Sequence, residues 1–152
     1  MTLAEKLVKP IYRMTYKELP AEVIEKVKLC LLHSLACAYA GIDERWSKAA
    51  REMTATLHPA GNASIWFSTR KSNMADAAFV NAVYAQSILY EDIHRDSNAH
   101  PGVVIIPTAL AVAEETGAPM TEVVTAIVAG YEMMARIGRG TACPEFGSRG
   151  FR

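Results

Sequence analysis

The sequence predicts an all-α protein whose helices form a single bundle. Long segments repeat apolar residues at helical spacing, glycine or proline marks most of their ends, and one short run favours a β-strand. That run is residues 63–68, which could form a strand or an extended edge. The chain has 152 residues, 51% of them apolar, so it can bury one core, and we expect one domain over residues 1–152.

Three helices are predicted in the first part of the chain. Residues 3–14 have helical spacing, although Pro10 should kink this helix or end it early. Residues 20–41 are clearer, because proline pre-sets the first turn and glycine closes the end. The second half of this segment is apolar nearly all round, so we expect a central helix covered on most sides. Residues 45–57 predict a third, more polar helix.

Two helices are predicted on either side of a charged loop in the second part of the chain. One runs from residue 74 to about residue 89, with Asn73 or Ser72 available to cap its start. The other covers residues 103–115, and Gly117 terminates it.

The last predicted helix starts at Thr121, whose side chain is a suitable cap. Gly130 lies inside it and costs about 1 kcal/mol relative to alanine, so we expect a tight helix contact there. Residues 138–152 contain four glycines and no periodicity, which predicts a loop-like C-terminal tail.

Composition excludes several classes of function. The formal net charge is zero and no basic stripe occurs, so the electrostatic signature of nucleic-acid binding is missing. No apolar run reaches the length of a membrane-spanning helix, and the first residues do not resemble a secretion signal. We therefore expect a cytoplasmic protein. Cys30, Cys37 and Cys143 match no ligand spacing, so we expect no metal site and small buried thiols.

Residues 86–102 are a polar insert between apolar helices, and they concentrate the candidate functional groups of the chain. Unpaired charges are costly to desolvate, so acids and histidines between buried helices need a reason. The insert either forms the wall of a pocket for a polar small molecule or is a solvated connector, and both interpretations remain open. Its ionisable residues are Glu91, Asp92, His94, Arg95, Asp96 and His100.

His100 is the residue in this insert best suited to acid–base chemistry, because both protonation states of imidazole are accessible near neutral pH. Gly102 and the free N–H groups after it could hold a substrate carboxylate at a helix start. Glu91 and Asp92 could orient His94 or His100, or bind a cation, although such a pair is more often solvated. The alternative for a lone histidine is local capping or packing. For His33, on the central helix, we expect a satisfied core histidine.

Several segments together resemble the MmgE/PrpD family in order and spacing. The resemblance implies an all-helical fold and a cofactor-free enzyme that acts on a small di- or tricarboxylate. It further implies removal of a proton next to a carboxylate, followed by elimination, decarboxylation or epimerisation. The matching segments are residues 27–36, 78–82, 90–92, 100–102, 109–117 and 129–132.

The chain departs from the family pattern at several site positions. The family's loop typically reads His-x-x-Asp-x-Asp-Asp-Thr before its His-Pro-Gly, and a histidine tends to follow a later Gly-Phe, where this chain has Arg152. Asp92 and His100 carry over, and Glu91 is a conservative change. The histidine, first aspartate and threonine of the loop are replaced by Gln86, Leu89 and Ile93.

Family members are several times longer, so the resemblance covers only the N-terminal part of their helical domain. The chain is therefore either a fragment or one subunit of a split enzyme, with a second protein chain supplying the C-terminal half. Charged residues make up only 21% of the chain, which favours association as a homo- or hetero-oligomer because apolar surface needs covering.

The leading hypothesis is a cofactor-independent lyase or isomerase subunit that transfers a proton on a small carboxylate or enolisable carbonyl substrate. His100 is the expected acid/base, Asp92 would orient it or a neighbouring group, and His94 could replace a lost polar group. Glu91, Gly102 and Arg152 are the expected substrate-binding residues. The alternative is a non-catalytic subunit that stabilises or regulates a partner. A binding module that clamps a ligand with the loop is a third interpretation.

Overall fold

The computed structural model describes residues 1–57, 61–141 and 148, and it confirms the predicted helical class. A short antiparallel hairpin pairs Ala63 with Ser72 and Ser64 with Lys71, so strand structure covers only the start of the predicted β-prone run. The elements in chain order are α1 (Leu3–Tyr12), the 3-10 turn η1 (Tyr16–Glu18), α2 (Ala21–Gly41), α3 (Arg45–Leu57), β1 (Ala63–Ser64), β2 (Lys71–Ser72), α4 (Met74–Gln86), the 3-10 turn η2 (Arg95–Ser97), α5 (Pro101–Thr116) and α6 (Met120–Thr141).

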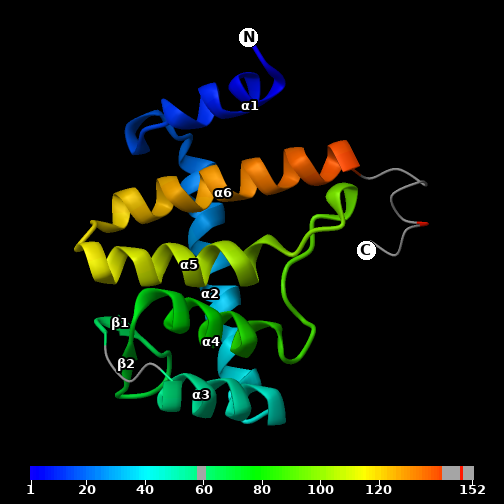
Figure 1. Ribbon diagram of the computed structural model, residues 1–152. Helices are drawn as coiled ribbons and strands as arrows, with labels where there is room; N and C mark the ends of the chain where they lie inside the picture. The colour runs from blue at the N-terminus through cyan, green and yellow to red at the C-terminus, as the bar shows by residue number, and fades with distance from the viewer. Residues whose placement is uncertain (58–60, 142–147, 149–152) are drawn as a thin grey trace.

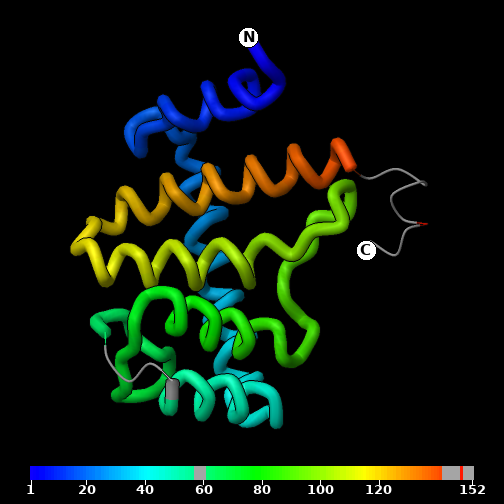
Figure 2. The backbone as a smooth tube through the Cα atoms, viewed as in Figure 1, coloured from blue at the N-terminus to red at the C-terminus, as the bar shows by residue number. Residues whose placement is uncertain are grey.

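Four helices lie side by side as one layer, in the order α3, α4, α5 and α6 (Figure 1). Helix α2 crosses one face of this layer and contacts α4, α5 and α6, and α1 lies beyond α6 (Figure 2). The prediction that α2 is covered on most sides is wrong within the described residues. Its outward side chains Leu29, Leu32 and Tyr39 are exposed, because a single layer of helices covers one face of α2 only.

Within the described residues, the core consists of two clusters, and α5 contributes to both. One surrounds α4, where the alanines allow close helix approach and Val80 and Tyr84 are almost fully buried. The other joins α2, α5 and α6 around Ile106 and Ile127. Buried Asn81 ties the hairpin to α4, because its amide donates to the Ser64 carbonyl and accepts from the backbone N–H that follows Ile65.

Two predicted helix-end signals are confirmed, and one predicted cap is wrong. The side chain of Asn73 caps α4 by accepting from the backbone N–H of Asp76, and Gly117 ends α5 with a φ of +70°. Thr121 does not cap α6. The helix starts at Met120, where the carbonyl of Pro119 accepts the first backbone N–H groups, so Thr121 already lies in the first turn.

Three boundaries differ from the predicted ones. Helix α1 continues past Pro10 but ends at Tyr12, two residues short of the predicted end. Helix α4 ends at Gln86 rather than near residue 89. Helix α6 runs to Thr141, so the tail predicted over residues 138–152 is helical at its start, and the rest lies outside the described residues except Ser148. No helix in the described ranges is long and apolar enough to cross a membrane.

We predict that the fold is more stable with glycine at position 130 than with any larger residue there. A Cβ there would lie 2.6 Å from Cγ2 of Ile105 on α5, which confirms the expected tight helix contact. Overpacking costs about 1–3 kcal/mol, which exceeds the gain of about 1 kcal/mol in helix propensity. Gly130→Ala should therefore lower the free energy of unfolding, measured by urea denaturation.

Gly140 supplies the matched control in the same helix. Nothing lies within 4 Å of a Cβ built at this position, so Gly140→Ala should leave stability unchanged or raise it by up to about 1 kcal/mol. Equal effects of the two substitutions would contradict the packing explanation.

Candidate active site at the start of helix α5

The polar insert folds into a compact turn against the N-terminal end of α5. The backbone groups of His94 and Ala99 exchange hydrogen bonds of 2.8 and 3.3 Å, and Asn98 closes the turn in the left-handed region at a φ of +48°. The turn packs on α6, where a Cβ at Gly138 would meet Ser97. The insert is therefore an ordered part of the fold and not a free connector.

The carboxylate of Asp92 joins three elements. It accepts a hydrogen bond of 2.9 Å from the backbone N–H of Gly102 at the start of α5, and one of 2.8 Å from the hydroxyl of Tyr131 on α6. A carboxylate is favoured at the positive end of a helix. A Cβ at Gly102 would collide with this carboxylate, so the position needs glycine. The backbone N–H of Gly102, which we expected to bind substrate, already donates to the Asp92 carboxylate.

Tyr131 is held as a hydrogen-bond donor. Burial raises the pKa of its hydroxyl far above the usual value for tyrosine, and the hydrogen bond to the neighbouring Asp92 carboxylate raises it further. The phenol therefore stays protonated at neutral pH and donates to Asp92. The sequence analysis missed this residue, although it lies in one of the segments that resemble the family.

Glu91, not Asp92, is the acid beside His100. Oε1 of Glu91 lies 3.0 Å from Nδ1 of His100, within ion-pair distance but without the alignment of a hydrogen bond. The Glu91 side chain is only 3% exposed, and its Oε2 has no hydrogen-bond partner among the described residues. The imidazole is 43% exposed, although its Nδ1 is buried. The pair therefore buries a carboxylate behind a ring that other molecules can reach.

Helix α2 contributes residues that lie close to the acid pair. The ring of His33 contacts the carbonyl of Tyr90 at 3.1 Å, so this histidine has a partner, as predicted, but it is only partly buried and not in the core. Burial raises the pKa of Cys30 and of Cys37, and the negative charge of Asp92 near both thiols adds to it. Both thiols are therefore protonated and poor nucleophiles. Buried Ser34, between them on the helix, has an unpartnered hydroxyl within the described structure.

The remaining predicted site residues do not join this group. Nδ1 of His94 contacts the hydroxyl of Ser97 at 2.8 Å, within its own turn. Arg152 lies outside the described residues. Leu89 and Ile93 are both exposed. Among the residues that the structure describes, no group of three or more histidine, cysteine, aspartate or glutamate side chains could hold a metal ion.

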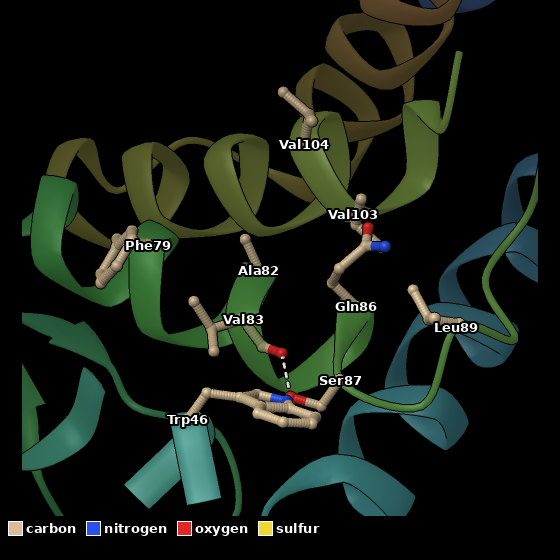
Figure 3. A pocket seen from close by; sticks show the side chains of 9 residues that line it. All are labelled: Trp46, Phe79, Ala82, Val83, Gln86, Ser87, Leu89, Val103 and Val104. Atoms are coloured by element: carbon tan, nitrogen blue, oxygen red, sulfur yellow. Dashed lines mark hydrogen bonds between the residues drawn. The ribbon is translucent and has the colours of Figure 1, made fainter. Parts of the chain in front are cut away.

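A hollow of about 530 Å³ opens between α3, α4 and α5 (Figure 3). Its wall is mostly apolar, and its polar side-chain groups are the Gln86 amide, the Ser87 hydroxyl and the indole N–H of Trp46. The Ser87 hydroxyl donates to the carbonyl of Val83. The wall consists of Trp46, Phe79, Ala82, Val83, Gln86, Ser87, Leu89, Val103 and Val104.

Comparison with known proteins identifies the family to which this chain belongs. Residues 5–150 match the MmgE/PrpD N-terminal domain, and the chain belongs to the MmgE/PrpD family. It is 27% identical over 127 residues to the cis-aconitate decarboxylase of Aspergillus terreus, a match that covers 80% of this chain and 26% of the relative.

A second relative gives a similar result. The cis-aconitate decarboxylase-like protein oryM of Aspergillus oryzae is 26% identical over 141 residues, which cover 88% of this chain and 29% of that protein. The chain thus spans between a quarter and a third of the length of the relatives it matches. No solved structure gives a significant match.

Tyr131→Phe should destabilise the chain at neutral pH. The substitution removes a hydrogen bond to a carboxylate, which typically contributes about 1.5–3 kcal/mol. Urea denaturation should show this loss, whereas Tyr12→Phe, at an exposed tyrosine of α1, should have no effect. If Tyr131→Phe leaves the free energy of unfolding unchanged, the hydrogen bond from Tyr131 does not stabilise the Asp92 carboxylate.

Tyr131→Phe should also change how the free energy of unfolding falls at alkaline pH. The folded pKa of Tyr131 lies above the ordinary value of 10.0, so the unfolded chain loses this proton first. The corresponding stabilisation is fully present below about pH 10 and is lost as the pH rises towards the folded value. Tyr131→Phe should therefore show a smaller loss of stability above pH 10 than the parent chain; equal losses would contradict the burial of this hydroxyl.

Proposed function

We propose that this chain supplies the acid–base residue of an enzyme that moves a proton on the carbon next to a carboxylate. His100 is the catalytic acid/base, and Glu91 positions its ring. The observation that carries the proposal is the almost fully buried Glu91 carboxylate 3.0 Å from Nδ1 of a partly exposed imidazole. This arrangement is typical of histidines that act in proton transfer.

The proposed roles of the two ring nitrogens follow from this contact. Nδ1 faces Glu91, so a small rotation of the ring would let it donate a hydrogen bond to that carboxylate. Nε2 would then carry the lone pair that accepts a proton from substrate carbon, and the Glu91 charge would stabilise the imidazolium that forms. Reprotonation on the other face gives an epimer, and loss of a leaving group from the adjacent carbon completes an elimination. In a decarboxylation the C–CO₂ bond would break first, and the imidazolium would donate its proton to the carbanion that remains.

The substrate and the rest of the site are part of the proposal. Two relatives are named as cis-aconitate decarboxylase or as similar to it, which supports a small carboxylate as substrate. Both are more than three times as long as the stretch they share with this chain, which supports a further protein segment or a second chain that completes the site. We place this reaction in the cytoplasm.

A second function, a non-catalytic subunit that stabilises a partner, has its own support. Leu89 and Ile93 are 76% and 53% exposed, and they stand where the family pattern has an aspartate and a threonine. Neither side chain can transfer a proton or donate a hydrogen bond. Asp92 and the Gly102 N–H are occupied by each other, which fits a structural role for these two groups.

Replacing His100 with asparagine tests the catalytic role. His100→Asn should lower proton exchange at least about a hundredfold, because positioned acid–base groups contribute about 10²–10⁴ in rate. The thermal transition should change little, since asparagine is favoured at the position before a helix. The tagged chain, purified from its own host with any bound subunit, is incubated in D₂O with small carboxylates, and deuterium at the carbon next to the carboxylate is followed by NMR. Undiminished exchange would leave the non-catalytic function as the explanation.

Glu91→Gln tests the positioning role separately. The substitution keeps the shape of the side chain but removes the charge beside Nδ1, so kcat should fall by about tenfold or more while KM changes little. Glu132→Gln is the matched control, because it removes an acid from an exposed ion pair with Arg136 on α6. If kcat of the Glu91 variant stays at the parent value, Glu91 does not position the catalytic ring, whatever its effect on stability.

A further inference from the structure

The chain makes a tight turn just before the buried acid of the proposed site. Leu89 lies in the left-handed region of backbone conformation, with a φ of +53°, where a leucine is strained. The side chains of Leu89 and Tyr90 are both exposed, so packing against the core does not hold this turn. The side chain of Glu91, the next residue, is nevertheless almost fully buried. Contacts to the backbone of the turn therefore have to keep it in place.

The ring of His33 on α2 supplies such a contact. Its Nε2 lies 3.1 Å from the carbonyl oxygen of Tyr90. A carbonyl oxygen can only accept a hydrogen bond, so Nε2 of His33 carries the hydrogen and donates it. The same nitrogen lies 3.7 Å from the sulfur of Cys37, one turn further along α2. The hydrogen bond directs the carbonyl of the peptide group between Tyr90 and Glu91 towards α2.

This turn of α2 also lies close to the side chain of Glu91. Burial raises the pKa of the Cys37 thiol, and the negative charge of Glu91 raises it further, as expected for a carboxylate nearby. The Tyr90 carbonyl and the Glu91 nitrogen belong to one planar peptide group, so a fixed carbonyl also fixes the backbone at the start of Glu91. The contact from His33 therefore helps to set the direction in which the Glu91 side chain leaves the backbone.

We propose that His33 is a positioning residue for the acid–base pair. By holding the Tyr90 carbonyl, it keeps the Glu91 carboxylate 3.0 Å from Nδ1 of His100. The inference rests on the proposed function, because it concerns the placement of the proposed catalytic ring. His33 acts through the backbone and transfers no proton itself. Supporting contacts of this kind typically change activity by about 10–100-fold.

Substitutions at position 33 separate the hydrogen bond from the bulk of the ring. Glutamine carries an amide N–H at nearly the position of Nε2, so His33→Gln should keep kcat close to the parent value. His33→Leu has no donor, so kcat for deuterium exchange should fall about tenfold or more while KM changes little. Lys28→Leu, at an exposed residue of the same helix, is the control and should leave kcat unchanged.

A double substitution tests whether His33 acts through Glu91. In the Glu91→Gln background the charge that His33 positions is absent, so adding His33→Leu should lower kcat no further. A merely structural loss on α2 would instead multiply with the effect of Glu91→Gln. Multiplied effects, or equal kcat for His33→Leu and His33→Gln, would overturn the positioning role.

The ring nitrogens of His100 give a readout that does not depend on turnover. Their ¹⁵N resonances, assigned by their absence in His100→Asn, should move in His33→Leu in the same direction as in Glu91→Gln. They should stay in place in His33→Gln. If His33→Leu does not fold, His33→Asn takes its place, because its shorter amide cannot reach the Tyr90 carbonyl.

The two readouts separate this inference from the proposed reaction. Resonances that move as expected, in a parent protein that exchanges no deuterium, would support the positioning role and overturn the reaction. Resonances that stay in place in His33→Leu would overturn the positioning role, whether or not the parent protein exchanges deuterium.

Discussion

The carboxylate of Asp92 is the contact on which the candidate site depends. It is fixed by a backbone N–H of α5 and by the hydroxyl of Tyr131 on α6, so one side chain joins the loop to two helices. The joint needs the small size of Gly102, since any Cβ there would displace the carboxylate. The Asp92 carboxylate also neutralises the positive end of the α5 helix dipole. Its charge is stabilised only while the Gly102 N–H and the Tyr131 hydroxyl both donate to it.

Fixing Asp92 also fixes the residue before it. Glu91 is attached to a backbone that α5 and α6 hold at Asp92 and that α2 holds at Tyr90 through the ring of His33. Its carboxylate therefore stays buried beside His100 without a hydrogen bond of its own to the backbone. Acid–base groups work best when neighbouring contacts already set their geometry, and this segment is held from three helices.

The sequence predicted the elements better than the contacts between them. Local signals identified the helix class, the Asn73 cap and the Gly117 end, because each depends on residues only a few positions apart. Two neighbouring acids look alike in a sequence, so the orienting role was assigned to Asp92 although Glu91 lies beside His100. Their partners decide the roles, and the decisive one, Tyr131, lies 39 residues further along the chain.

Among the residues that the structure describes, Oε2 of Glu91 has no hydrogen-bond partner, and this bears on whether the site is catalytic or structural. A buried oxygen without a partner costs about 1–3 kcal/mol, and more when it carries charge, so a fold maintained for stability alone would gain by replacing it. Asp92, in contrast, has both oxygens engaged and is explained by architecture. Buried groups that remain costly are typical of positions retained for chemistry. The contrast between two adjacent acids, one satisfied and one not, therefore favours the acid–base function over the purely structural one.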